Sequence, residues 1–282
     1  MSQLNYYTAE RISEHVTRIT SLTGEFIYLV EGECKAALID TCLGVGHLRN
    51  FVEKITDKPI IVILTHGHVD HAMGAPEFDE VYMNSADNKI FQEHKLMEAR
   101  KGYIHMVLAG RMPEIDDYDF VQPSEPNFKE LKDGMVYDLG GLNLELYETP
   151  GHTPGSMAIL IREERTLLLG DACNTFTFLF DEYALSVEEY RDVLQRLDQL
   201  TKNKYDKVYL SHGLGDASKE MIASAIEVCN DIISGNADDI PFNFMEKQAV
   251  LAKTIGEDRN RTDGGLANII YDKNKVFVKK TE

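Results

Sequence analysis

The chain has 282 residues, of which 43% are hydrophobic, enough for a sizeable buried core in one large domain or two small ones. Its formal net charge of −18 repels phosphate backbones, so nucleic acid is an unfavourable partner. The sequence has no run of about 18 apolar residues and no secretory signal, and its four cysteines fit reduced thiols, so we expect a cytoplasmic protein without a membrane span.

The first third of the chain reads as strands with one helix. Short apolar runs rich in β-branched residues predict strands at residues 15–19, 25–30, 35–40, 59–64 and 80–83. Gly32-Glu33 is typical of a hairpin turn, and apolar residues at helical spacing predict a helix over 47–55.

Residues 86–126 have a different character from their surroundings. A polar stretch with helically spaced apolar residues predicts an amphipathic helix over 87–100, and an acidic patch follows at 116–119. Long insertions near a binding site often carry specificity, so this segment is either a packed surface excursion or a substrate lid.

The second half repeats the order of strands followed by helix. Strands are expected at 142–147, 157–161, 166–169 and 207–210, helices at 186–200 and 218–233, and a terminal hairpin from 266–271 and 275–278. The repetition favours one compact α/β domain spanning residues 1–282, with four layers, over two independent domains.

One motif concentrates polar side chains that bind metals. Thr65-His66-Gly67-His68-Val69-Asp70-His71 directly follows the strand at 59–64. Open α/β sheets place ligand sites at the carboxyl ends of their strands. Imidazole and carboxylate together suit Zn(II), Fe(II) or Mn(II), so the motif predicts a metal site.

Three further polar residues each follow an apolar strand. His152 lies in a turn with two prolines and two glycines, and Asp171 and His212 end buried strands. Each one alone is more typical of a hydrogen-bonded loop residue. Their shared position predicts that they emerge at the same edge as His66 and its neighbours.

The chain resembles the metallo-β-lactamase-fold superfamily of hydrolases. The resemblance lies in THGHVDHAMG at 65–74, PGHTPGS at 150–156, GDA at 170–172 and SHG at 211–213, in the family's order. It implies a four-layer αββα sandwich that binds two divalent metal ions. By this resemblance His66, His68 and His152 hold the first ion, Asp70, His71 and His212 hold the second, and Asp171 bridges them. A metal-bridging hydroxide would attack an electrophilic carbonyl, and Asp70 would also orient the hydroxide and transfer a proton.

Two positions narrow the resemblance to the glyoxalase II and lactonase-like branch. Oxygen-reducing members of the superfamily carry a glutamate where this chain has His68, and the β-lactamases generally carry Cys or Ser where it has Asp171. We therefore expect a hydrolase of a small ester, thioester or lactone, with zinc the first choice of metal and iron or manganese also compatible. A phosphodiesterase of the same fold and a metal-binding or sensor protein without turnover stay open, as does a homodimer. A glutathione-binding set of basic residues is not matched.

The loop after Asp171 is rich in aromatic residues. We expect Phe176 and Tyr183 to line the substrate pocket, and Phe178 and Phe180 to pack against the 186–200 helix or a partner subunit. Cys173 reads as a small buried residue. Thr65, Thr153 and Ser211 are candidates to support the ligands, whereas His94 and His105 read as ordinary polar residues of the insertion.

Overall fold

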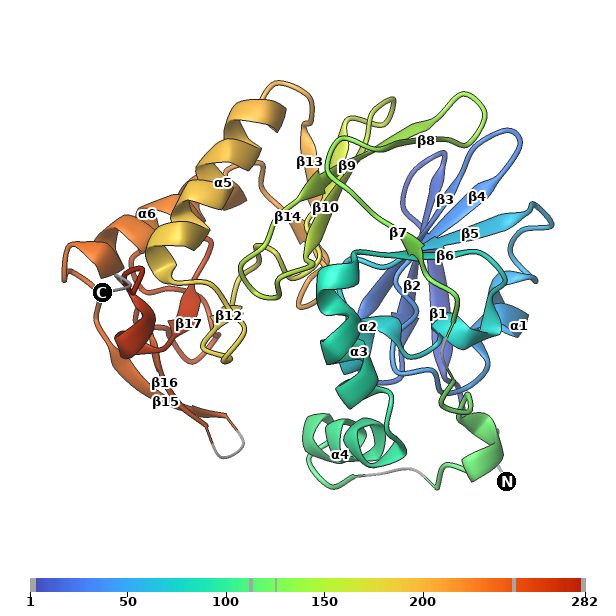
Figure 1. Cartoon of the computed structure of the whole chain (residues 1–282), viewed down its shortest axis with the longest axis horizontal. Coiled ribbons are helices and arrows are strands. Elements are labelled where there is room, and N and C mark those ends of the chain that lie inside the picture. The colour runs from blue at the N-terminus through green and yellow to red at the C-terminus, as the bar shows by residue number, and fades with distance from the viewer. Residues whose placement is uncertain (1–3, 112–113, 125, 245–246, 280–282) are drawn as a thin grey trace.

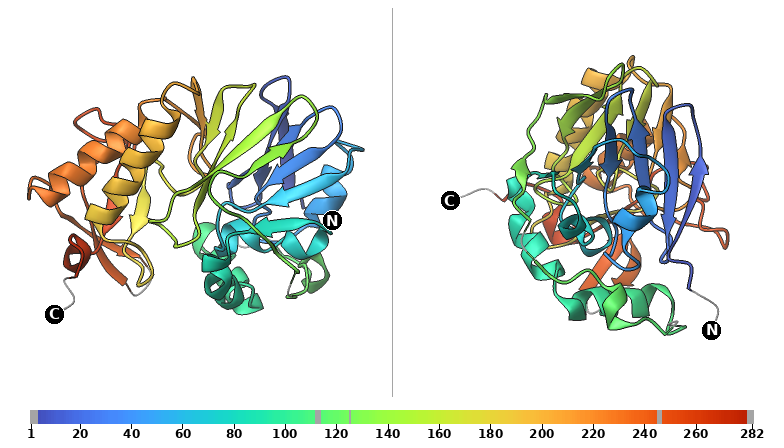
Figure 2. Two further views of the ribbon diagram at one scale, coloured as in Figure 1. Left: turned by 45° about the horizontal axis from the view of Figure 1, so that its top comes forward. Right: turned by 90° about the vertical axis from the view of Figure 1, so that its right-hand side faces the viewer.

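Two sheets packed face to face, with helices on their outer sides, form an αββα sandwich (Figures 1 and 2). The computed structural model describes residues 4–111, 114–124, 126–244 and 247–279. The four-layer α/β fold expected from the sequence is confirmed. Within those ranges the structure contains no helix that is both long and apolar enough to cross a membrane.

The first sheet has seven strands in sequence order. They are β1 (Tyr7–Arg11), β2 (Val16–Ser21), β3 (Phe26–Glu31), β4 (Ala36–Ile39), β5 (Ile60–Ile63), β6 (Val81–Met83) and β7 (Lys129–Glu130). The first four pair antiparallel, and β4 to β7 run parallel, which brings the carboxyl ends of β4, β5 and β6 to one edge.

The second sheet has six strands in the order β14-β13-β11-β10-β9-β8. Their bounds are β8 (Val136–Asp138), β9 (Asn143–Glu148), β10 (Met157–Ile161), β11 (Thr166–Leu168), β13 (Lys207–Tyr209) and β14 (Asp216–Ala217). Because β11 and β13 are parallel neighbours, the residues that follow them emerge side by side.

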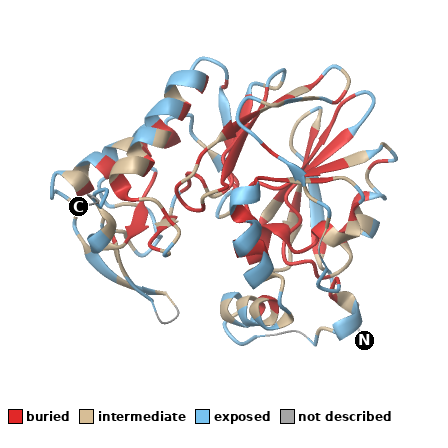
Figure 3. Cartoon of the chain, viewed as in Figure 1, coloured by how far each residue is buried: buried red, intermediate tan, exposed pale blue. Residues whose placement is uncertain are grey.

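Apolar side chains fill the space between the two sheets. Tyr28 of β3 stacks on Tyr209 of β13 with ring centroids 5.5 Å apart, among buried residues from both sheets. Figure 3 shows this pattern, with the facing strands buried and the outer helix surfaces exposed. Such tight packing of two inner faces fixes the sheets, and hence the loops at their edge, relative to each other.

Helices cover both outer faces. The first sheet carries α1 (Leu48–Val52), α2 (Val69–Ala72), α3 (Asn88–His94) and α4 (Met97–Val107), and the second carries α5 (Val187–Thr201) and α6 (Met221–Ile233). Single 3₁₀ turns lie at Ala75–Glu77, Ser85–Asp87, Asp117–Asp119 and Lys273–Lys275. A capping box opens α5: the Ser186 hydroxyl accepts from the Glu189 N–H, and the Glu189 carboxylate accepts from the Ser186 N–H.

Two predicted elements differ from the structure. The helix expected over 87–100 is two helices, α3 and α4, and α4 continues to Val107. The terminal hairpin is wrong: β17 (Ile269–Tyr271) is followed by a 3₁₀ turn that the Asp272 side chain caps by accepting the Asn274 N–H. The local bond at Asp272 stops the chain from turning back as a second strand.

A third sheet, not expected from the sequence, lies below α5 and α6 in Figure 1. Its order is β12-β17-β16-β15, with β12 (Thr177–Leu179), β15 (Ile240–Phe244) and β16 (Lys247–Leu251). Since β17 pairs parallel with β12, the end of the chain is tied to the segment that follows Asp171.

Glu145 on β9 makes the free energy of unfolding depend on pH in the acid range. Its carboxylate accepts bonds from the Tyr147 hydroxyl at 2.6 Å, Arg162 Nε at 2.7 Å and Lys204 Nζ at 3.1 Å. Burial raises the pKa of Glu145, but these bonds outweigh burial and lower the pKa to about 2. Because this folded-state pKa lies below the unfolded value of about 4.3, the ionised group stabilises the fold above about pH 4.3 and loses that effect as pH falls toward 2.

We therefore expect the free energy of unfolding of Glu145→Gln to fall less steeply than that of the wild type as pH decreases from about 4.3 toward 2. Urea unfolding at several pH values measures the decline, with Glu227→Gln on the exposed side of α6 as the control. An acid slope for Glu145→Gln equal to that of the control would contradict this role.

Candidate metal centre

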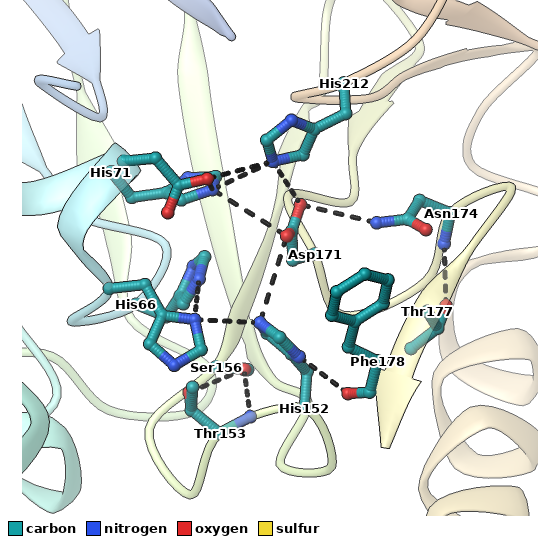
Figure 4. A network of polar contacts seen from close by, with 12 residues as sticks. His66, His71, His152, Thr153, Ser156, Asp171, Asn174, Thr177, Phe178 and His212 are labelled. Atoms are coloured by element: carbon teal, nitrogen blue, oxygen red, sulfur yellow. Dashed lines mark hydrogen bonds and ion pairs between the residues drawn. The ribbon is translucent and has the colours of Figure 1, made fainter. Parts of the chain in front are cut away.

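Strand ends from both sheets bring the candidate ligands together (Figure 4). His66 follows β5 by three residues, and His68 is the N-cap of α2, which places Asp70 and His71 in the short helix. The other three residues come from the second sheet: His152 from the β9–β10 loop, Asp171 after β11 and His212 after β13.

Three histidines converge in a first group. His66 Nε2 lies 3.1 Å from His68 Nδ1, and His152 Nε2 lies 2.9 Å from the same atom. All three side chains are buried. Their ligand atoms belong to a set that lies within 4.8 Å and could hold a metal ion.

For two of the three histidines, His66 and His152, the outer nitrogen has a partner that assigns its proton. His66 Nδ1 donates to the Thr65 hydroxyl at 3.0 Å, because that hydroxyl itself donates to Asp40. His152 Nδ1 donates to the Phe178 carbonyl at 2.7 Å, and His68 Nε2 lies 2.6 Å from the Tyr183 hydroxyl. The inner nitrogens of His66 and His152 therefore present their lone pairs to His68 Nδ1.

The charge state and the spacing of these nitrogens show whether the site fits a metal ion. Burial lowers the pKa of His66 and of His68 well below the usual range, so both rings are neutral. A neutral His68 can donate from Nδ1 to at most one of the two facing nitrogens, so at least one lone pair is available to bind a cation. Zinc–nitrogen bonds of about 2.0 Å in a tetrahedron separate ligands by roughly 3.3 Å, close to the spacing here. The donor set fits a divalent ion.

Asp70, His71 and His212 form a second group. His71 Nε2 lies 3.2 Å from His212 Nε2, and Asp70 Oδ2 lies 3.7 Å and 3.6 Å from these two nitrogens. Burial lowers the pKa of His71, but the Asp70, Asp40 and Asp171 carboxylates outweigh burial and raise it to about 10. The carboxylates thus create a field that favours positive charge at this position.

Asp171 lies between the two groups. Its Oδ2 is 3.8 Å from both His71 Nε2 and His152 Nε2, and its Oδ1 is 3.3 Å from His212 Nε2. Burial raises the pKa of Asp171, but His212 and His71 outweigh burial and hold the pKa well below its usual range. The structure thus brings the seven expected residues to one place, with one carboxylate facing both groups.

Asp40, at the end of β4, supports the second group. Its carboxylate accepts from the Thr65 N–H at 2.7 Å, the Thr65 hydroxyl at 2.8 Å and His71 Nδ1 at 2.8 Å. A carboxylate on the outer nitrogen of a ligating histidine fixes its ring and raises its basicity. The sequence did carry a signal, since Asp40 follows a buried strand as Asp171 does.

Asp87 joins the loops that carry His66 and His152. The Asp87 side chain is buried and accepts from the Gly67 N–H at 2.8 Å, the Gly155 N–H at 2.6 Å and the Thr153 hydroxyl at 2.7 Å. A Cβ at Gly155 would lie 2.7 Å from the Asp87 carboxyl carbon, so only glycine allows this approach. No sequence pattern distinguishes Asp87, which is one polar residue among many in the insertion.

The insertion reaches the site through two side chains. The Tyr103 hydroxyl on α4 lies 2.7 Å from Asp70 Oδ2 and 3.0 Å from Glu25 Oε1. His94 on α3 stacks against His68 with ring centroids 5.0 Å apart and accepts the Val69 N–H at 3.0 Å. His94 is therefore a neighbour of the site rather than an ordinary polar residue, whereas His105 lies exposed on α4.

The residues expected in the loop after Asp171 lie partly at the site and partly away from it. Tyr183 contacts His68, Cys173 is fully buried, and Phe176 is partly buried in an aromatic cluster. Phe178 and Phe180 pack against each other and against Phe244 of β15 rather than on α5, the first of the two neighbours expected for them, and packing against a partner subunit stays a prediction. Their neighbours belong to the third sheet, which was not expected from the sequence.

The two threonines expected to support ligands, Thr65 and Thr153, contact Asp40 and Asp87, and the Ser211 carbonyl accepts the Phe26 N–H.

Replacing Asp40 with asparagine is expected to weaken metal binding about 10- to 100-fold, because the histidine ring loses the charge that orients it. Competition with a chromophoric chelator measures the affinity. Asp79→Asn, at an exposed residue paired with Arg49, is the control and should keep the wild-type affinity. Equal affinities for the two variants would contradict the support role of Asp40.

Residues 21–212 match the model of the metallo-beta-lactamase superfamily, so the chain belongs to that superfamily. Among curated relatives, the acyl-coenzyme A thioesterase MBLAC2 of Gallus gallus is 24% identical over 209 residues, covering 66% of this chain and 71% of the relative. Hydroxyacylglutathione hydrolase GloC of Haemophilus influenzae is 26% identical over 147 residues, covering 50% of this chain and 62% of the relative.

Solved structures share the fold at low identity. A metallo-beta-lactamase from Pontibacter korlensis superposes with a TM-score of 0.57 and 18% identity, covering 78% of this chain and 97% of the other. The sec-alkylsulfatase Pisa1 from a Pseudomonas species superposes with a TM-score of 0.62 and 15% identity, covering 81% of this chain and 42% of the other. At these identities the likeness supports the fold alone.

Proposed function

We propose that the chain is a hydrolase with two divalent metal ions, most favourably zinc, that cleaves a small ester, thioester or lactone. The observation that carries the proposal is the convergence of six nitrogen and carboxylate ligands in two groups, with Asp171 facing both. Such a donor set, with imidazoles whose outer nitrogens are already bonded, has no evident purpose without cations between the inner nitrogens.

Each side chain has a distinct task in this proposal. His66, His68 and His152 hold one ion, Asp70, His71 and His212 hold the other, and Asp171 is shared. Bound ions would acidify a water molecule to a pKa of about 7 and polarise the scissile carbonyl.

Asp70 has a second task as the proton acceptor for the attacking water. It is buried, and the Tyr103 hydroxyl at 2.7 Å keeps one of its oxygens in a fixed direction. A carboxylate held in this way can accept a proton at one oxygen and pass it toward the leaving group.

Thioesters are the substrate class we favour. Two relatives at low identity are named as an acyl-coenzyme A thioesterase and a hydroxyacylglutathione hydrolase, and both names describe thioester cleavage. The net charge of −18 opposes phosphodiesters of nucleic acids. A cavity of about 560 Å³ next to the site, lined by Tyr183, His94 and Phe180 among others, offers room for part of such a substrate.

The insertion at 86–126 acts as the lid of this single domain in our proposal. Tyr103 and His94 already reach the ligands from α4 and α3, so a movement of these helices would alter access to the site. A cytoplasmic location agrees with the four cysteines, which are all free, three of them buried.

A substrate panel tests the proposed function. The metal-replete protein should hydrolyse acyl thioesters with a kcat/KM at least about a hundredfold above that for bis(p-nitrophenyl) phosphate. Preference for the phosphodiester would establish the alternative activity of the same fold. A metal-replete protein that is inert across esters, thioesters, lactones and phosphodiesters would favour a binding or sensor role and contradict the proposal.

A further inference from the structure

The third sheet has two apolar faces with different surroundings. Leu179, Ile269 and Tyr271 point to the core beneath α5 and α6. The opposite side carries a group that we call the aromatic face, made up of Phe176, Phe178, Phe180, Phe242, Phe244, Leu251 and Ile270. Four of its five phenylalanines are only partly buried, so their rings meet water.

The rings of the aromatic face form one continuous surface. The Phe178 centroid lies 5.2 Å from Phe180, 6.1 Å from Phe242 and 5.1 Å from Phe244. Clustered rings of this kind leave apolar area in contact with solvent, which is unfavourable and marks a surface for a ligand or partner. Phe242 and Phe244 lie two positions apart on β15, so at about 3.4 Å per residue the surface extends about 7 Å along this strand.

This surface begins at the candidate metal centre. The Phe178 carbonyl accepts the bond from His152 Nδ1, and Figure 4 shows the Phe178 ring directed toward the Asp171 end of the site. Phe180 lines the same cavity as Tyr183, whose hydroxyl lies 2.6 Å from His68 Nε2. A group extending from a carbonyl at the metals would therefore meet the aromatic face directly.

The charges beside this surface do not suit a polyanion. The cavity lining includes Lys247, Lys275 and Lys279, but also Glu93, Glu182 and Asp272. Lys247 is paired with Asp181, and the Lys275 ammonium donates to the carbonyls of Asp181, Glu182 and Ala184. Two of the three lysines thus have internal partners, which leaves little positive charge for a phosphorylated carrier.

We propose that the aromatic face binds the hydrocarbon chain of an acyl thioester whose carbonyl lies at the metal centre. The inference rests on the proposed function and names the part of the substrate that this sheet selects. A longer acyl chain buries more methylene groups against the rings, and each fully buried methylene is worth about a fourfold gain in binding.

Kinetics with one thiol and two acyl groups test the inference. The octanoyl thioester should have a kcat/KM at least about thirtyfold above the acetyl thioester. Phe244→Ser should reduce this octanoyl-to-acetyl ratio about fivefold or more, whereas Phe244→Leu should retain most of it. Phe277→Ser, at a phenylalanine that is 55% exposed and outside the aromatic face, is the matched control and should keep the wild-type ratio.

A binding measurement separates this inference from the proposed hydrolysis. Equilibrium dialysis of decanoate against purified protein should show a dissociation constant about tenfold higher for Phe244→Ser than for Phe277→Ser. Phe242→Ser replaces the first variant if Phe244→Ser does not fold. The binding difference would support the inference even if no thioester were cleaved, in which case the proposed function alone would fail.

Two outcomes overturn the inference. The first is a protein that cleaves acetyl and octanoyl thioesters equally well and binds decanoate no better than Phe244→Ser, which would leave the proposed function intact. The second is an unchanged octanoyl-to-acetyl ratio in Phe244→Ser together with conversion from dimer to monomer in light scattering. That result would show that a second copy of the chain covers the aromatic face.

Discussion

Asp171→Ala is expected to lower kcat/KM for any cleaved thioester by at least about a thousandfold. The Asp171 carboxylate faces both groups, within 3.8 Å of His71 and His152 and 3.3 Å of His212. Its loss removes the shared negative charge that balances the two ions. Metal ions contribute several kcal/mol to such reactions, and each 1.4 kcal/mol is a factor of ten in rate.

The same variant should remain folded, so the lost activity can be assigned to the site. Asp192→Ala, at an exposed residue of α5, is the matched control and should keep wild-type activity. Steady-state kinetics and thermal unfolding of both variants make the comparison. An Asp171→Ala protein with full metal content and full hydrolysis would rule out a shared ligand at this position.

Arg100→Met is expected to lower the free energy of unfolding by about 3–5 kcal/mol. The Arg100 side chain on α4 is 1% exposed, and its guanidinium donates to the carbonyls of Leu43, Gly44 and Val121. It also lies 5.2 Å from the centroid of the Phe120 ring. Methionine would fill part of the space but leave the Leu43 and Val121 carbonyls without the Arg100 donor, whereas the Gly44 carbonyl keeps the Val121 N–H at 2.8 Å.

Lys101→Met provides the control one position further along α4. The Lys101 ammonium lies 2.5 Å from Asp117, but both side chains are exposed, so this pair is worth about 1 kcal/mol or less. Urea unfolding measures both variants. Equal destabilisation of the two would contradict the role of Arg100 in joining α4 and Val121 to the loop that follows β4.

The effect of Arg100→Met should extend to the metal centre. Tyr103 lies one turn further along α4 and contacts Asp70, so a displaced helix would release that carboxylate. We expect weaker metal binding in Arg100→Met at temperatures where the protein is still folded. Unchanged affinity would show that Asp70 keeps its position without α4.

Much of the fold follows from local patterns in the sequence. Strands and helices alternate twice, and buried runs such as 59–64 have the composition of central strands, so four layers could be predicted. The third sheet could not, because β12 has three residues and is held by β17, about ninety positions away. Such pairing depends on long-range contacts rather than on local preference.

The candidate ligands could also be predicted from local sequence. Each of them follows a strand, and parallel strands bring their carboxyl ends to one edge. Asp40 obeys the same rule and could have been included. Asp87 and Tyr103 could not, because their contacts with Thr153 and Asp70 depend on the path that the insertion takes across the first sheet.

We propose that the seven residues bind two metal ions per chain. Elemental analysis of protein saturated with divalent metal and then dialysed measures this number. We expect two ions per chain in the wild type and fewer in Asp171→Ala, with the Asp192→Ala control at two. A saturated wild-type protein that retains one ion or none would contradict a two-metal centre.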